Sequence, residues 1–377
     1  MKLREVADII AFDQRGTGIS HKLPNCPYSP DFELKRAIGK QEYVQKTTKN
    51  IRKCLDFWER KEINLTSYNT TESAIDIDDL RRFLGVNKIS ILGMSYGLHL
   101  AFEYIRLYEE KIDKVVLASL EGSDETIKLP KETEKFVFHL AKLAENNYNS
   151  ELKYPELKEK IITVHQRLKD NPVTTSFIDR RGEIVEVGIS NFELQSAIAT
   201  FYLKNPDDSK KLPKLYSQMY DGDFTAIAVN VMITKRYVLN SLRPMPFAMD
   251  MQSGISHSRS KRIKKQINNS LLGSGINFLL YEWMTEIDFG QLPNEFREMQ
   301  KNNVNALLFS GTIDGRTYLN SGKNIANKFK NGVHVIVENA GHDLFMQSPK
   351  IGHMVLDFFK GNKLFSKRIV LEPVIFD

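Results

Sequence analysis

The chain has 377 residues, 41% of them hydrophobic, and a formal net charge of +6 at neutral pH. That is enough to bury a sizeable core, which excludes a disordered tail or a minimal binding module, and no apolar run approaches the ~18 residues of a membrane span. The densest basic run, at 259–265, has no interleaved aromatic residues, so we interpret it as a solvated helix face and expect no nucleic-acid partner.

The first predicted strand lies at 8–12, Asp-Ile-Ile-Ala-Phe, after what the sequence indicates is the end of a helix at 1–7. An amphipathic helix follows at 71–84, and Gly85 ends it.

A strand at 88–92 leads into Gly-Met-Ser-Tyr-Gly at 93–97, and a helix follows at 98–105. This strand, Gly-x-Ser-x-Gly and helix order is the nucleophile elbow of an α/β hydrolase, in which the turn is strained and the serine hydroxyl is exposed. We expect a Cβ at either flanking glycine to collide with the strand or the helix. Ser95 is the predicted nucleophile.

Beyond a further strand at 114–119, the alternation of strands and helices stops over 122–299. This region predicts helices at 132–147 and 193–203 and a hairpin at 175–187 that turns at 181–182. An insertion at this point is the position of a cap that covers the site.

The strand–helix pattern resumes near residue 300. Asp314 follows a predicted strand at 305–310, and His342 follows another at 333–337, before a closing helix at 350–359. Acid and then histidine after the serine is the chain order of the hydrolase triad, and strand ends are where open α/β sheets place their sites. Asp314 would orient His342, which would take the proton of Ser95. Asp343 is the alternative acid, but it follows no strand of its own.

These elements predict an α/β-hydrolase fold, a mostly parallel sheet flanked by helices with a mainly helical cap inserted after the sixth strand. The expected domains are a first part of the core at 1–121, the cap at 122–299, and a second part of the core at 300–377.

Five further segments of the chain are distinctive. They are Phe-Asp-Gln-Arg-Gly-Thr-Gly-Ile-Ser at 12–20, Leu-Thr-Ser-Tyr-Asn-Thr-Thr at 65–71, Leu-Ala-Ser-Leu-Glu-Gly at 117–122, Ser-Gly-Thr-Ile-Asp-Gly-Arg at 310–316 and Ala-Gly-His at 340–342. These segments resemble the prolyl aminopeptidases (proline iminopeptidases) and the related tripeptidyl-aminopeptidase-like hydrolases, over nearly the whole chain. The resemblance implies a serine aminopeptidase that uses Ser95, Asp314 and His342, acts on small peptides with a free N-terminus, and needs no cofactor or metal.

That family also has a His-Gly-Gly-Pro-Gly loop after its third strand, which supplies half of the oxyanion hole and does not occur in this sequence. Without the N-terminal strands, we expect a gap in the sheet between the fourth and fifth strands, with unpaired buried backbone groups on both sides. The backbone N–H of Tyr96 would be the remaining oxyanion donor. Either the natural product is longer, which we favour, or the gene has decayed.

An aminopeptidase must bind a free α-ammonium, and Glu121 is the candidate carboxylate because it follows the sixth strand, near Ser95. The alternative is a surface residue before a turn. Two other functions stay open, an esterase that uses the same three residues on an uncharged substrate, and an inactive remnant that at most binds peptides.

The chain has two cysteines, Cys26 and Cys54, and no histidine cluster that would make a zinc site with them. Secreted members of the similar family have cysteines in comparable places. We therefore favour a disulfide, worth about 3 kcal/mol, over two reduced thiols, and with it a periplasmic or secreted location.

Overall fold

The computed structural model describes residues 3–146, 154–240, 242–364 and 366–377. Its main sheet has the order β1-β2-β5-β6-β7, and every neighbouring pair is parallel. Parallel neighbours joined through helices are the arrangement predicted for an α/β-hydrolase core. The strands are β1 (Ile89–Met94), β2 (Ile112–Ala118), β5 (Asn302–Gly311), β6 (Phe329–Glu338) and β7 (Arg368–Val370).

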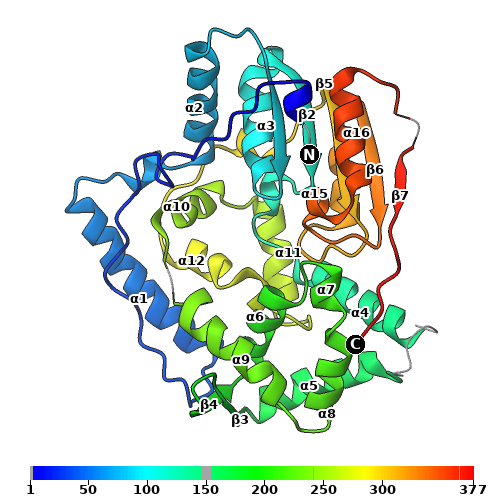
Figure 1. Cartoon of the computed structure of the whole chain (residues 1–377). Coiled ribbons are helices and arrows are strands. Elements are labelled where there is room, and N and C mark those ends of the chain that lie inside the picture. Colours follow the sequence, from blue (N-terminus) through cyan, green and yellow to red (C-terminus); the bar gives the residue numbers. More distant parts are fainter. Residues whose placement is uncertain (1–2, 147–153, 241, 365) are drawn as a thin grey trace.

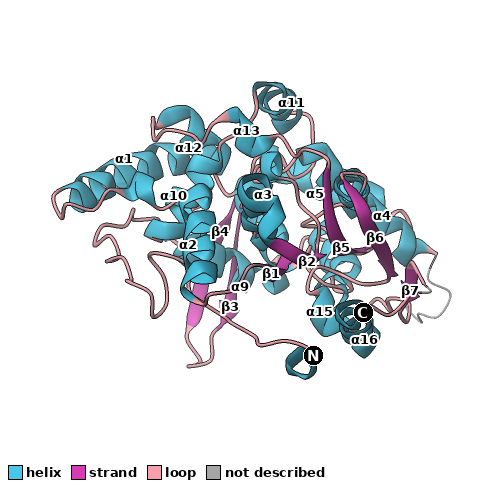
Figure 2. Cartoon of the chain, turned by 90° about the horizontal axis from the view of Figure 1, so that it is seen from above, coloured by secondary structure: helices cyan, strands magenta, loops and turns pink. Residues whose placement is uncertain are grey.

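Both faces of the sheet are covered, as its continuous apolar strands require. Alternate residues of β2 face opposite sides: Val115 and Leu117 pack with α3, and Val116 and Ala118 pack with α16. Figures 1 and 2 show α3 and α16 on opposite sides of the strands. The helices of the first face are α2 (Thr70–Phe83), α3 (Gly97–Tyr108) and α14 (Leu319–Ala326), and those of the second are α15 (Leu344–Gln347) and α16 (Pro349–Lys360).

The predicted strand at 8–12 is wrong. These residues have no regular structure, and Ile9, Ile10 and Phe12 are 54%, 53% and 40% exposed. A strand needs a hydrogen-bonding neighbour, and none of the described strands pairs with this segment. The gap that we expected inside the sheet is therefore an open edge at β1, where Leu92 is 43% exposed. Among the described residues before it, Leu3–Glu5 form a short 3₁₀ turn, η1, in place of the helix end expected at 1–7, of which residues 1–2 lie outside the described part of the chain.

The other predicted elements of the core are confirmed. The helix expected at 71–84 is α2, and Gly85 follows it with φ +69°. The strands expected at 88–92, 114–119, 305–310 and 333–337 are β1, β2, β5 and β6, and the closing helix is α16. The short β7, which pairs with the end of β6, was not predicted from the sequence.

Between β2 and β5 the chain is mainly helical, as predicted. The two predicted helices are α4 (Pro130–Glu145) and α6 (Asn191–Phe201), and the hairpin is β3 (Val173–Ile178) with β4 (Ile184–Ile189). No helix in the described ranges has the length and apolar character to cross a membrane. The remaining elements of this region are η4 (Ser123–Glu125), α5 (Leu157–Asp170), α7 (Pro206–Ser209), α8 (Leu212–Tyr220), α9 (Thr225–Ile233), η5 (Thr234–Val238), α10 (Pro244–Ser253), α11 (His257–Ile267), η6 (Gly275–Asn277), α12 (Leu280–Glu286) and α13 (Asn294–Arg297).

The long helix α1 (Lys40–Glu59) packs against this helical region and away from the sheet (Figure 1). Tyr43 packs with Phe192 of α6, and its hydroxyl donates to Glu193 Oε1 at 2.7 Å. Glu193 also pairs with Lys235 Nζ at 3.0 Å, and both side chains are almost fully buried. The start of α1 is thus tied to the helical region by a buried charged network.

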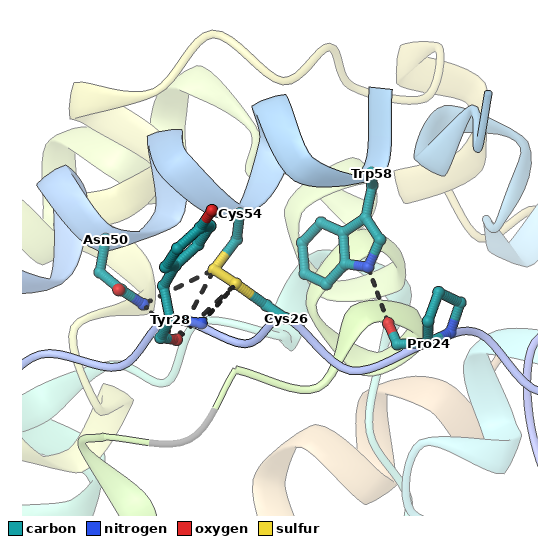
Figure 3. The surroundings of a disulfide bond; sticks show 6 residues. All are labelled: Pro24, Cys26, Tyr28, Asn50, Cys54 and Trp58. Atoms are coloured by element: carbon teal, nitrogen blue, oxygen red, sulfur yellow. Dashed lines mark hydrogen bonds between the residues drawn. A yellow bond between two sulfur atoms is a disulfide. The ribbon is translucent and has the colours of Figure 1, made fainter. Parts of the chain in front are cut away.

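A disulfide joins Cys26 to Cys54 of α1, with the two Cα atoms 5.4 Å apart (Figure 3). One turn further along α1, Trp58 Nε1 donates to the Pro24 carbonyl at 2.8 Å, and the indole is fully buried. Together these two contacts fasten the irregular segment before α1 to the helix.

Candidate active site

Ser95 lies in the turn between β1 and α3. Its φ of +55° is in the left-handed region, which is strained for a residue with a side chain. The turn is held on both sides: the Ser95 N–H donates to the Ala118 carbonyl at 3.1 Å, and the Ser95 carbonyl accepts from Leu98 N–H at 2.9 Å. A Cβ at Gly93 would lie 3.2 Å from the Gly97 carbonyl oxygen, whereas one at Gly97 would have no neighbour within 4 Å. The crowding that we expected on both sides of Ser95 is thus found only at Gly93.

Asp314 and His342 meet at the ends of β5 and β6. His342 Nδ1 lies 2.9 Å from Asp314 Oδ2, and the residues are 5% and 3% exposed. Asp314 Oδ1 accepts from the backbone N–H groups of Arg316 and Thr317 at 2.7 and 2.9 Å, and Thr317 Oγ1 donates to Oδ2. The carboxylate is therefore fixed by its own loop, and it is positioned to hold the histidine in one orientation.

The end of β2 connects this pair to the serine. Ala118 accepts from the Ser95 N–H, and the next residue, Ser119, donates its hydroxyl to the His342 carbonyl. Within the described part of the chain, neither the Ser95 hydroxyl nor His342 Nε2 has a hydrogen-bond partner. The structure thus brings together Asp314 and His342 and places Ser95 on the other side of β2, without a hydrogen bond between serine and histidine. Such bonds often form only when substrate is present.

The cap region contacts both the acid loop and the histidine loop. The Leu203 carbonyl accepts from Gly315 N–H at 2.9 Å, and the Lys204 carbonyl accepts from His342 N–H at 2.8 Å. Asp343, the alternative acid, pairs with Lys204 Nζ at 3.0 Å and accepts from Asn205 Nδ2 at 2.7 Å. Its carboxylate thus joins the histidine loop to the cap, while Asp314 holds the imidazole.

Tyr96 follows the serine at the start of α3. Its backbone N–H, the predicted oxyanion donor, makes no hydrogen bond to any described residue. Its hydroxyl lies 2.9 Å from Thr70 Oγ1, and its ring lies 4.9 Å from the His99 ring. Burial raises the pKa of this phenol, which keeps it neutral.

Glu121 is buried, and it is already paired. Lys128 Nζ lies 2.5 Å from its Oε2 and His99 Nε2 lies 3.4 Å from its Oε1. Burial acts to raise the pKa of Glu121, but Lys128 and His99 outweigh it and hold that pKa well below its usual value. An ammonium group of a substrate would therefore compete with Lys128 for this carboxylate.

Two side chains near the site were missed by the sequence analysis. Asp250 of α10 is half-buried with no hydrogen bond to any described residue, and burial raises its pKa to about 7. Asp250 interacts electrostatically with Tyr96 and with His99. Arg316, two residues after the acid, has a buried Nη1 without a partner in the described chain. No local motif marks either residue, because the surroundings of each are formed by segments that are distant in sequence.

The described residues contain no group of three or more metal-ligating side chains.

Comparison with known proteins agrees with this arrangement. Residues 2–158 match a family model described as alpha/beta hydrolase fold, and residues 282–364 match one described as TAP-like protein. The chain therefore has the α/β-hydrolase fold, and its likeness to hydrolases extends to both parts of the core.

Curated relatives match over a limited stretch. YuaR of Escherichia coli strain K12 is 30% identical over 123 residues, which cover 33% of this chain and 23% of the relative. Serine protease Hip1 of Mycobacterium tuberculosis strain H37Rv is 26% identical over 124 residues, which cover 31% of this chain and 24% of that protein. The match thus spans about a quarter of each relative's length. Among solved structures, serine hydrolase CCSP0084 from Cycloclasticus zankles aligns over 93% of this chain and 78% of its own, with 13% identity and a TM-score of 0.35.

Proposed function

We propose that this chain is a serine hydrolase that removes N-terminal residues, with proline as the first candidate, from peptides through an acyl-enzyme. The observation that carries the proposal is the buried Asp314–His342 hydrogen bond at the ends of β5 and β6, together with the strained Ser95 at the end of β1, on the other side of β2. The TAP-like match over 282–364, which includes both residues, and the likeness to a protein named as a serine protease support it.

The reaction follows from the roles of the three side chains. Ser95 Oγ attacks the scissile carbonyl, and His342 Nε2 takes its proton while Asp314 stabilises the imidazolium. The tetrahedral oxyanion accepts from the Tyr96 N–H. His342 then gives the proton to the leaving amine, and the acyl group stays on Ser95. A water molecule attacks the ester as His342 takes its proton, which returns to Ser95 as the acid leaves.

Specificity for a free N-terminus would come from carboxylates near the serine. Glu121 and Asp250 are the candidates, and Asp250 is the stronger one because no described cation pairs with it. A substrate ammonium next to Asp250 would favour the charged carboxylate and form a charge-assisted hydrogen bond.

The test compares three substrates on the purified chain: Pro-4-nitroanilide, its N-acetylated form, and 4-nitrophenyl acetate. An aminopeptidase hydrolyses the first and loses at least about a hundredfold in kcat/KM on the second, because an acetylated amine offers no charge to a carboxylate. The Ser95→Ala variant is the matched control for each substrate.

The second candidate is an esterase on uncharged substrates. The pairing of Glu121 with Lys128 favours it, since that pair neutralises one of the two carboxylates. Hydrolysis of the ester alone, or equal hydrolysis of both anilides, would establish this alternative and refute the aminopeptidase. Hydrolysis unchanged in Ser95→Ala would refute both.

A further inference from the structure

A narrow cavity lies beside the acid loop, and its charges are unevenly paired. It is lined by residues of the cap and of the core, and it holds about 20 Å³, room for roughly one water-sized group. Thr317, which donates to the proposed catalytic acid, forms part of its wall. Its charged lining residues are Glu121, Glu125, Lys128, Glu132, Arg259 and Arg316.

Each of the three carboxylates in this cavity has a cation of its own. Glu121 pairs with Lys128 at 2.5 Å, Glu125 lies 3.7 Å from Arg259, and Glu132 lies 2.8 Å from Lys135. Asp314, behind the wall, is paired with His342. The remaining charge is Arg316, for which the described residues provide no ion pair. Arg316 is therefore the one charged lining residue of this cavity that has no ion pair among the described residues.

The guanidinium of Arg316 is held in place. Its Cζ lies 5.6 Å from the centre of the Phe278 ring, and the side chain is half-buried. Its Nη1 is buried without a hydrogen-bond partner in the described chain. A buried donor that is left unpaired costs about 1–3 kcal/mol, and more when charged, so this one favours a ligand that accepts a hydrogen bond.

We propose that Arg316 binds a carboxylate of the substrate, namely the free C-terminus of a short peptide whose N-terminal residue is removed at Ser95. This inference rests on the proposed function and specifies its substrate class. A carboxylate supplies both the negative charge and the acceptor that the guanidinium lacks. The small volume admits a carboxylate oxygen but excludes a bulky side chain.

Binding to the inactive Ser95→Ala protein tests the proposal apart from catalysis. Calorimetry would compare the dipeptide Pro-Ala with Pro-Ala-amide and with Pro-Glu-amide, whose carboxylate belongs to a side chain. We expect Pro-Ala to bind at least about tenfold more tightly than Pro-Ala-amide, the size of one charge-assisted hydrogen bond. That preference should vanish in Ser95→Ala/Arg316→Gln and be partly restored in Ser95→Ala/Arg316→Lys. The control for loss of one positive charge is Ser95→Ala/Arg180→Gln, because Arg180 is exposed. This variant should keep the preference for Pro-Ala over Pro-Ala-amide.

Equal binding of acid and amide to Ser95→Ala, absence of binding by both, or a preference that survives Arg316→Gln would overturn the inference. A preference for Pro-Glu-amide over Pro-Ala would also overturn it, since the carboxylate would then come from a side chain. Hydrolysis of Pro-4-nitroanilide tests the proposed function independently, because this substrate has no carboxylate for Arg316 to bind. Hydrolysis without an Arg316-dependent preference would therefore refute only the inference about Arg316. An Arg316-dependent preference without hydrolysis would support the inference and refute the hydrolase. The side chain of Arg316 does not hold Asp314, because the backbone N–H does, so we expect Arg316→Gln to fold.

Discussion

His342 Nδ1 donates to Asp314 Oδ2 at 2.9 Å, while Asp343, the residue after the histidine, pairs with Lys204. These two acids thus have separate partners: Asp314 contacts the histidine side chain, and Asp343 contacts Lys204 of the cap. The proposed mechanism depends on this difference, and the chain offers a matched pair of variants to test it.

Asp314→Asn should lower kcat by about a thousandfold to ten-thousandfold, because an amide no longer holds the required tautomer of His342 or stabilises its charged form. Asp343→Asn should change kcat by less than about threefold, since it removes only a partly exposed contact to the cap. Steady-state kinetics on Pro-4-nitroanilide checks both. Comparable losses in the two variants, or a larger loss in Asp343→Asn, would show that the acid is wrongly assigned.

The pKa of Asp250 predicts how recognition of the substrate amine depends on pH. Because burial raises this pKa to about 7, the carboxyl is mostly neutral at pH 6 and mostly charged at pH 8. The titratable and charged groups that act on it are His99, Glu121, Lys128 and Arg243. The ratio of kcat/KM for Pro-4-nitroanilide to that for 4-nitrophenyl acetate should therefore rise as the pH increases from 6 to 8.

The ester serves as the control in that experiment, because both substrates use the same three proposed catalytic residues and differ in the amine. In Asp250→Asn the ratio should be low and independent of pH. A ratio that rises in the same way in this variant would exclude Asp250 as the group that binds the amine.

The sequence predicted much of this molecule where the signal is local. The elbow around Ser95, the loops of Asp314 and His342 and the hairpin at 175–187 each follow from a short motif between strongly apolar or alternating segments. Such segments keep their structure because backbone hydrogen bonding and burial of one face agree within them.

The remaining features depend on distant segments. The residues at 8–12 have the composition of a buried strand, yet they stay irregular because strand formation needs a neighbour that a local pattern does not reveal. Likewise, Asp250 and Arg316 are ordinary residues in sequence, and only the packing of the cap near the elbow and the acid loop leaves them unpaired. The crowding expected at Gly97 was absent because the surroundings of α3 are open there.

The disulfide should contribute strongly to stability. Cys26 and Cys54 close a loop with a sequence separation of 28, for which the loss of chain entropy in the unfolded state predicts about 3–4 kcal/mol. Cys26→Ala/Cys54→Ala should lose this amount in urea denaturation, and a reducing agent should destabilise only the wild-type protein. Equal effects of the reducing agent on both proteins would contradict the prediction.

Removing only one partner of the buried ion pair between Glu193 and Lys235 should strongly lower the free energy of unfolding. Lys235→Met leaves a buried carboxylate without its cation, which typically costs about 3–5 kcal/mol. Burial already raises the pKa of Glu193, and removal of Lys235 raises it further. The deficit, which is the stability that Lys235→Met loses relative to the wild-type protein, should therefore be largest at high pH. It should shrink as the pH falls and Glu193 becomes protonated in the folded state.

Urea denaturation at pH 5 and pH 8 measures this deficit. The double variant Glu193→Gln/Lys235→Met should recover most of the lost stability, because it removes both charges and keeps an oxygen that accepts from the Tyr43 hydroxyl. A double variant that is less stable than Lys235→Met, or a deficit that grows toward low pH, would contradict the assignment of this pair.

If Ser95 is an activated nucleophile, a reagent that reacts only with activated serines must modify it, and covalent labelling measures this. The purified chain would be incubated with a fluorophosphonate, which reacts with activated serines, and analysed by mass spectrometry of the intact protein and of its peptides. We expect one adduct per chain, located on Ser95, absent from Ser95→Ala and strongly reduced in Asp314→Asn. An unmodified wild-type chain, or an adduct that persists in Ser95→Ala, would contradict it.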